Sequence, residues 1–161
     1  MVLYLLYVSA ELQDVEWLTM SSETSWHLNV MDPITRDIRE GVVISERDVV
    51  PIAGGRSNAN FVLTWPGSQK ASYITVVRDV KNVTRPIRGE DSGQYVPMVG
   101  FECRGIEPIA WSPIGDFRVK ALNGDIFIAD DFRDDWSDFD EDHQVALGVF
   151  EVRSKFQVLK L

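Results

Sequence analysis

The chain is poor in the residues that build disulfide-stapled or metal-bound proteins. Among 161 residues there is one cysteine, Cys103, and there are two histidines, His27 and His143. A single cysteine excludes an intramolecular disulfide, which is typical of a reducing compartment. We therefore expect a cytoplasmic protein, with the nucleus as a second location. Because a lone cysteine usually behaves as a small apolar residue, Cys103 is predicted to belong to the core.

Basic residues and long hydrophobic runs are also scarce. The chain has 16 Lys and Arg against 25 Asp and Glu, which gives a formal net charge of -9. An acidic surface repels both nucleic acid and anionic membranes, so we expect neither as a partner. The apolar start, residues 2–12, is too short to cross a membrane and lacks the basic residues that open a signal peptide. It is predicted to form a buried strand instead.

Sequence signatures of common enzymes are missing as well. The chain contains no G-x-S-x-G, no phosphate-binding loop of the G-x-x-x-x-G-K type and no G-x-G-x-x-G. Its Gly-rich stretch "AGGRSNANF", 53–61, leads into an apparent strand, whereas phosphate binding needs a helix N-terminus there. Neither histidine lies near a serine or cysteine in a nucleophile motif. We therefore predict that the protein is not an enzyme.

What the sequence does contain is a repeated β pattern. It is 45% hydrophobic and 11% aromatic, which is enough for a packed core. Alternating or short apolar runs, rich in branched and aromatic residues, are separated by Gly, Pro and Asn turns. The expected strands are 2–12, 25–31, 41–45, 60–65, 72–80, 95–103, 117–122, 125–129 and 146–159. We expect a mostly β protein, an antiparallel β-sandwich, folded as a single compact domain over residues 1–161.

Turn and helix signals add detail to this pattern. Asn123-Gly124 predicts a two-residue hairpin with a type I′ turn. Residues 14–20 and 137–144 are each predicted to hold a short helical turn, the second with Ser137 as its N-cap. The polar stretch "TRPIRGEDSG" divides the chain into an N-terminal half of about 1–84 and a C-terminal half of about 94–161.

The stretch "DDFRDDWSDFDED", 130–142, is the most charged part of the chain. It fails as an EF-hand, because Asp135 stands at the sixth position of the loop where glycine is needed. The favoured interpretation is a solvated loop that Trp136 and Phe139 anchor to the core. Two alternatives remain open, namely an acidic docking surface and a calcium or magnesium site built from carboxylates.

Several stretches resemble a known family. "AELQDVEWL" (10–18), "GGRSNANF" (54–61), "FECRGIEPIAW" (101–111), "DWSDFDED" (135–142) and "GVFEV" (148–152) are similar, in order and spacing, to the eukaryotic CXXC-motif-containing zinc-binding proteins. Members of that family are small proteins of largely unknown function. The resemblance implies a β-rich sandwich of two pseudo-symmetric halves, with the acidic stretch away from the zinc ligands.

The resemblance also exposes a departure at the zinc site. Family members carry two C-x-x-C pairs in the N-terminal half, which supply the thiolates of a tetrahedral zinc site. The matching positions here are Asp32 and Thr35 for the first pair, and Trp65 and Ser68 for the second. None is a cysteine, and His27 is a single imidazole nearby. We therefore predict a degenerate member without bound zinc or any other cofactor.

Some other interaction must then hold these two turns, because structural zinc contributes on the order of 10 kcal/mol to comparable sites. Pro33 and Pro66 stiffen the turns. We expect Trp65 to pack across the site onto the 32–35 turn, with Ile34 adding apolar area between the turns.

Two classes of function follow. The first is a non-enzymatic, monomeric protein that binds another protein, and its candidate interaction surface comprises Asp134, Asp135, Trp136, Asp138 and Asp140. The alternative is an enzyme or small-ligand binder with a cleft near Arg104, Glu107, Trp111 and Trp136. Against this alternative, Arg104 and Glu107 are predicted to form a structural ion pair within their turn.

Overall fold

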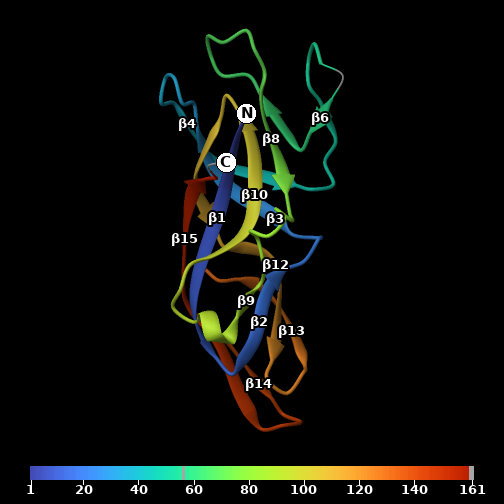
Figure 1. Cartoon of the computed structure of the whole chain (residues 1–161), viewed down its shortest axis with the longest axis vertical. Helices are drawn as coiled ribbons and strands as arrows, with labels where there is room; N and C mark the ends of the chain where they lie inside the picture. The colour runs from blue at the N-terminus through green and yellow to red at the C-terminus, as the bar shows by residue number, and fades with distance from the viewer. Residues whose placement is uncertain (56, 160–161) are drawn as a thin grey trace.

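The computed structural model describes residues 1–55 and 57–159 and is mostly β (Figure 1). Within these residues one short 3-10 turn, η1 (Gly89–Asp91), is the only helical element. The first eight strands are β1 (Val2–Gln13), β2 (Val15–Met20), β3 (Ser25–Met31), β4 (Ile38–Ser45), β5 (Val50–Pro51), β6 (Asn58–Ala59), β7 (Phe61–Leu63) and β8 (Ser72–Val77). The rest are β9 (Ile87–Arg88), β10 (Val96–Arg104), β11 (Glu107–Ser112), β12 (Ile114–Ala121), β13 (Ile126–Asp131), β14 (Trp136–Asp140) and β15 (Val145–Val158).

All strand pairs of the described residues are antiparallel, which confirms the predicted fold class. A six-stranded sheet has the order β14-β15-β1-β10-β8-β7. Smaller sheets have the orders β11-β3-β4, β13-β12-β2-β9 and β5-β6. Each strand expected from the sequence overlaps an observed strand. Arg56, in the Gly-rich stretch, lies outside the described residues.

β1 lies at the centre of the largest sheet, and its residues Leu5, Leu6, Val8 and Ala10 are almost fully buried. This strand reads as a nearly continuous apolar run because both of its faces are covered. It pairs with β10 on one side and with β15 on the other, so the predicted N-terminal and C-terminal halves share a sheet. The division of the chain near 84–94 stays a prediction.

Aromatic rings fill the space between the sheets. Trp26 meets Phe101 edge-to-face at 5.5 Å between ring centroids, and Trp111 meets Phe117 in the same way at 6.3 Å. Edge-to-face contacts of this kind add to the stabilisation from burial. Together the rings form the core that fixes the positions of the turns at both ends of the molecule.

Within the described residues, no helix is long and apolar enough to cross a membrane.

Both predicted helical turns are wrong. Residues 15–20 form β2, which pairs with β12 and β9, and residues 136–140 form β14, which pairs with β15. Ser137 is therefore a strand residue opposite Gly148 and not an N-cap. In both segments the pairing with neighbouring strands overrides a weak local preference for helix.

The hairpin at Asn123-Gly124 is confirmed, but its turn type is not. Gly124 has a φ of +101°, whereas Asn123 is not among the residues with positive φ. The Gly124 N–H donates to the Ala121 carbonyl at 3.0 Å, and the Ala121 N–H donates to the Asp125 carbonyl at 2.8 Å. These bonds define a three-residue loop with glycine at its left-handed position, which adds a residue compared with the predicted type I′ turn.

Candidate functional site

Three segments far apart in the sequence enclose a cavity of about 350 Å³. It lies at the end of the molecule where β8 begins and β10 ends, opposite to β13 and β14 (Figure 1). We call it the turn cavity. Its lining residues are Asp32, Ile34, Thr35, Trp65, Pro66, Gly67, Ser68, Lys70, Ala71, Ser72, Arg104 and Gly105. The four positions that we predict to match the family's zinc ligands, Asp32, Thr35, Trp65 and Ser68, therefore all line one cavity.

Trp65 is the anchor of this cavity. Its side chain is 5% exposed, and its indole N–H donates to the Gly105 carbonyl at 2.8 Å. This bond ties the 65–68 turn to the turn after β10, a contact between residues 40 positions apart. Ile34 does not contribute in the predicted way, because it is 88% exposed. The expected apolar packing of Ile34 between the turns is wrong, since the 32–35 turn is held by polar bonds instead.

Asp32 supplies those polar bonds. Its buried carboxylate accepts hydrogen bonds from the Ile34 N–H at 3.0 Å and from the Thr35 hydroxyl at 3.1 Å. The Arg36 N–H donates to the Asp32 carbonyl at 2.8 Å and closes the turn. An aspartate that bonds to its own following backbone is a common way of fixing a turn. Asp32 therefore performs a structural task within its own loop.

Zinc does not fit the residues at this site. Structural zinc takes thiolate, imidazole or carboxylate ligands, usually four of them. The Trp65 indole N–H is a donor already used by Gly105, Ser68 bonds within its own loop, and the Thr35 hydroxyl donates to Asp32. His27 lies in β3 and lines a different hollow, beside Glu23 and Asp116. Asp32 is thus the one conventional zinc ligand that lines the cavity.

The lone cysteine lies away from this cavity. Cys103 is buried within β10, opposite Ile74 and Val2, and is 1% exposed. Burial raises the pKa of its thiol far above the ordinary value, so it stays protonated at neutral pH. Cys103 is a core residue, as the sequence predicts.

Two cations stand at the turn cavity without a charged partner. Lys70 and Arg104 line it and are exposed, and neither forms an ion pair with any residue that the structure describes. The predicted ion pair between Arg104 and Glu107 is therefore wrong. The turn at Gly105 separates the two residues, and Glu107 instead begins β11 opposite Met31. Sequence reasoning singled out Arg104 but missed Lys70, whose only signal is its proximity to the 65–68 turn.

The predicted cleft near Arg104, Glu107, Trp111 and Trp136 is not formed as one site. Trp111 is 8% exposed and packs between Trp26 and Phe117. Trp136 packs against Phe127 and Phe132. Both indoles thus belong to the aromatic core, while Arg104 lines the turn cavity.

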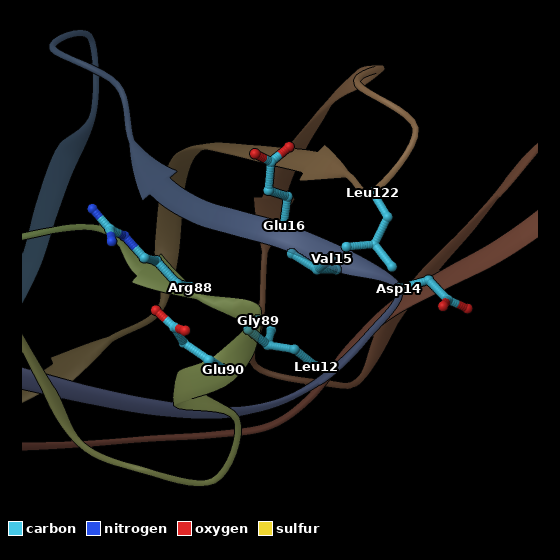
Figure 2. Close-up of a pocket in the computed structure, with 8 residues that line it drawn as sticks. All are labelled: Leu12, Asp14, Val15, Glu16, Arg88, Gly89, Glu90 and Leu122. Carbon is cyan, nitrogen blue, oxygen red and sulfur yellow. The ribbon is translucent and has the colours of Figure 1, made fainter.

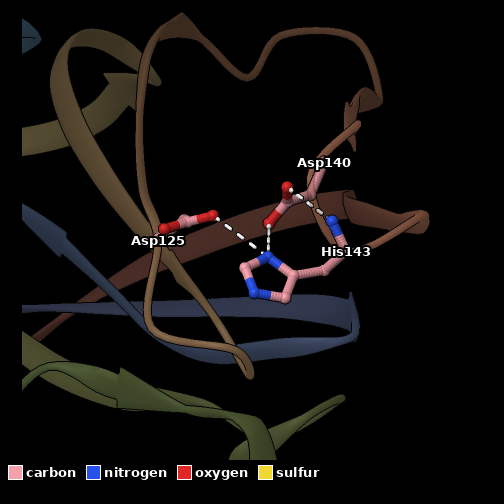
Figure 3. Close-up of side chains that lie close together, drawn as sticks. All are labelled: Asp125, Asp140 and His143. Atoms are coloured by element: carbon pink, nitrogen blue, oxygen red, sulfur yellow. Dashed lines mark hydrogen bonds and ion pairs between the residues drawn. The ribbon is translucent and has the colours of Figure 1, made fainter.

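The opposite end of the molecule carries a carboxylate cluster, which we call the hairpin end, formed by the turns at 121–125 and 140–145. Figure 3 shows Asp140 and Asp125 converging on the His143 ring, whose Nδ1 lies 3.2 Å from Asp140 and 3.5 Å from Asp125. The Asp140 carboxylate, 4% exposed, also accepts hydrogen bonds from the Asn123 amide and from the Asp142 N–H. These bonds join the β12–β13 hairpin to the β14–β15 hairpin.

The hydrogen bonds control the protonation of this cluster. Burial of Asp140 disfavours its charged form, but hydrogen bonds from Asn123, Asp125 and His143 outweigh this and lower its pKa to about 2. The hydrogen bond to Asp140 raises the pKa of Asp125. The carboxylate and imidazole atoms of the three residues lie within 4.8 Å of one another, but the Asp140 oxygens are already occupied by protein donors. The calcium or magnesium alternative stays a prediction.

The candidate interaction surface is only partly a surface. Asp134 and Asp138 are exposed, whereas Asp140 is buried in the hairpin end and Trp136 packs into the core. The Asp135 carboxylate accepts the Glu151 N–H at 2.9 Å, where Glu151 has a φ of +51°. Asp135 therefore stabilises an irregular point in β15.

A second cavity, of about 440 Å³, lies between β2, η1 and the β12–β13 turn (Figure 2). Arg88, Glu16 and Glu90 stand around it in the figure, so positive and negative charges are mixed at its edge. A Cβ at Gly89 would lie 2.4 Å from the Val15 carbonyl oxygen, which shows how closely η1 packs on β2. This glycine is needed for packing, and the cavity shows no convergent binding groups.

Fold and site together define a mostly β protein in which turns far apart in the sequence meet around one cavity. A family model for the eukaryotic CXXC motif containing zinc binding protein matches residues 5–157, and the chain belongs to this family. With one cysteine, it cannot itself carry the paired cysteines of the family name.

Known relatives agree with this assignment. The chain is 29% identical over 154 residues to the UPF0587 protein of Nematostella vectensis, covering 94% of this chain and 95% of that protein. It is 32% identical over 115 residues to the CXXC motif containing zinc binding protein of Xenopus laevis, covering 70% of each. A solved structure, a hypothetical protein from Plasmodium falciparum, superposes with a TM-score of 0.89 at 26% identity, covering 98% of this chain and 100% of that one. None of these relatives carries an enzymatic name.

Proposed function

We propose that this chain is a non-enzymatic, monomeric module that binds a basic segment of another protein along β14. The observation that carries this proposal is that one edge of β14 has no neighbouring strand among the described residues. β14 is the outermost strand of the six-stranded sheet, and it pairs with β15 alone among the described strands. An unpaired sheet edge offers backbone donors and acceptors to an added strand.

The side chains around β14 define the partner. Asp134 and Asp138 are exposed, and the Phe139 side chain, 48% exposed, stands out from the same strand. A partner strand with lysine or arginine beside an apolar residue complements this arrangement. The aspartates also prevent two copies from pairing edge to edge, because like charges would then face each other. This repulsion supports a monomer.

The contacts of the nucleophilic side chains support a non-enzymatic role. Among the hydrogen bonds of the described residues, none joins His27 or His143 to a serine or to Cys103. His143 bonds to carboxylates that hold two hairpins together. The cluster that most resembles a catalytic constellation thus has a structural task.

The test is a titration with a defined synthetic peptide of sequence KLKFKLK, blocked at both ends. We expect saturable changes in the amide NMR signals of residues 134–140, with an affinity that falls at least tenfold between low salt and about 0.3 M salt. The sequence-matched acidic peptide ELEFELE serves as the negative control.

The matched variants are Asp134→Asn with Asp138→Asn, compared with Asp79→Asn with Glu90→Gln, which removes two exposed charges elsewhere. The first pair is expected to weaken peptide binding about tenfold and the second pair less than twofold. Equal weakening by both pairs would mean that net charge and not the β14 surface attracts the peptide, and it would refute the proposal.

A further inference from the structure

Ser72 contributes a hydroxyl group to the wall of the turn cavity. It is 6% exposed and lines the cavity, yet its hydroxyl makes no hydrogen bond to any residue within 1–55 or 57–159. Among the described residues, the fully enclosed polar side-chain atoms without a partner are Nε1 of Trp26 and Nε1 of Trp111, so the Ser72 Oγ is still reached by solvent from the cavity. The Ser72 Oγ lies against the backbone of Gly105, where an added Cβ would approach it to 2.4 Å. The hydroxyl therefore faces the cavity and is free to donate a hydrogen bond to a molecule there, or to accept one.

Charge at the cavity favours an anion. Lys70 and Arg104 line it without ion-pair partners among the described residues, although the chain as a whole carries a net charge of -9. The Asp32 carboxylate opposes them, but both of its oxygens are engaged by donors of its own turn. An arginine with no partner is well suited to a carboxylate, which it binds through two parallel hydrogen bonds.

The size of the cavity favours a small molecule, and the indole in its wall favours an aromatic one. A volume of about 350 Å³ is near the lower end of the range for ligand pockets. Trp65 lines the cavity with part of its largely buried indole, and its bond to the Gly105 carbonyl fixes the orientation of that ring. Aromatic rings pack favourably against such a wall.

From these observations we propose that the turn cavity binds a small aromatic carboxylate. The carboxylate is held by Arg104 and the Ser72 hydroxyl, and the ring lies against Trp65. Lys70 adds to the attraction for the anion. This site is separate from β14 and does not depend on the proposed peptide binding there. In this member of the family, the turns that correspond to a zinc site serve an organic anion.

The probes are benzoate and its neutral counterpart benzamide, titrated into the full chain and followed by NMR. Benzoate is expected to give saturable shifts of the Gly67, Ser68 and Gly105 amides and of the Trp65 indole N–H. Benzamide has the same shape without the charge, so its affinity is expected to be at least tenfold lower. No saturable shift up to about 10 mM benzoate, or equal binding of the two probes, would overturn the proposal.

Variants locate the site. Arg104→Ala removes an exposed side chain, so it is expected to leave the fold intact while lowering benzoate affinity at least tenfold. Ser72→Ala is expected to lower it about fivefold. The control Lys81→Ala removes an exposed cation from the turn after β8 and is expected to change affinity less than twofold.

The Asp134→Asn, Asp138→Asn double variant separates this site from β14. It is expected to bind benzoate as the unmodified chain does. If benzoate affinity instead follows the β14 variants and ignores Arg104→Ala, the turn cavity is not the binding site.

Discussion

The two ends of this molecule join distant turns by opposite means. At the turn cavity, the buried indole of Trp65 donates one hydrogen bond to the Gly105 carbonyl and links two turns. At the hairpin end, the Asp140 carboxylate accepts hydrogen bonds from Asn123, Asp142 and His143 and links two hairpins. The first depends on apolar burial and a neutral donor, and the second depends on a charge. The comparison teaches that a small β protein can hold its turns together in two ways that respond differently to pH.

The largest effect is expected from removing the indole at the turn cavity. Trp65→Ala deletes a side chain that is 5% exposed, so it should lower the free energy of unfolding by about 3–5 kcal/mol, measured by urea denaturation. Trp65→Phe keeps a ring but loses the bond to Gly105, and should cost about 1–2 kcal/mol.

Ile34→Ala is the matched control, because it truncates an apolar residue of the same cavity that is 88% exposed. It should change the free energy of unfolding by less than about 0.5 kcal/mol. A similar loss for Trp65→Ala and Ile34→Ala would show that Trp65 does not hold the turns together.

Glycines at the two ends give a second comparison. Gly105 and Gly124 both have positive φ, +69° and +101°, so alanine at either position should cost about 1–2 kcal/mol in backbone strain. A Cβ at Gly105 would also lie 2.4 Å from the Ser72 Oγ, whereas the space at Gly124 is open. Thermal unfolding should therefore show Gly105→Ala as the more destabilised variant by about 1 kcal/mol. The reverse order would mean that the close packing of Ser72 on Gly105 is relieved at little cost.

The hairpin end should be sensitive to acid and the turn cavity should not. Because the pKa of Asp140 is lowered to about 2 in the folded state, its contribution to stability is fully present above the unfolded value of about 3.9 and is lost as pH falls towards 2. The raised pKa of Asp125 acts in the opposite sense, since its ionisation in the folded state costs stability as pH rises through its ordinary range.

Denaturant midpoints measured between pH 2 and pH 6 test this difference. Asp140→Asn should flatten the acid limb of the profile relative to the unmodified chain. Trp65→Phe should lower the denaturant midpoint by a similar amount at every pH, so the dependence of the midpoint on pH should stay unchanged. If Asp140→Asn retains the full acid limb, other carboxylates dominate the pH dependence, with Asp91 and Asp116 as the next candidates because their pKa values are also lowered.

The smallest effect is expected from removing metal. A structural zinc site contributes on the order of 10 kcal/mol, so a chelator would unfold or strongly destabilise a zinc-dependent chain. We expect excess EDTA to leave the melting temperature unchanged and elemental analysis to find zinc well below one atom per chain. Stoichiometric zinc would show that the turn cavity is held by metal after all, with Asp32 among its ligands.

Strand periodicity made most of the fold predictable, and its failures have physical causes. β14 was missed because aspartates have low strand preference, yet its pairing with β15 and the packing of Trp136 impose the strand. β11 contains Pro108, which weakens a strand pattern, and its register with β3 shifts after that residue. These strands depend on neighbours that local sequence does not reveal.

The two ends were predictable to different degrees. Resemblance to the family placed the 32–35 and 65–68 turns together. It gave no sign that Gly105 would receive the Trp65 bond or that Ser72 would line the same cavity, because three separate segments must meet for this. The link between Asp125 and His143 likewise joins two hairpins that are adjacent only in the folded sheet arrangement.

The position of β1 has a consequence for synthesis in the cell. This strand, complete at Gln13, pairs with β10 and with β15, which ends at Val158. At about 5–20 residues per second, the ribosome needs roughly 7–30 s to produce the later partner after the first strand is made. Both edges of this apolar strand are unpaired until β10 has been made, and the edge that β15 will cover stays unpaired until the end of synthesis, so nascent-chain chaperones would have to shield it. Ribosomes stalled before residue 145 should therefore display β1 in a protease-sensitive form, and release of the complete chain should protect it.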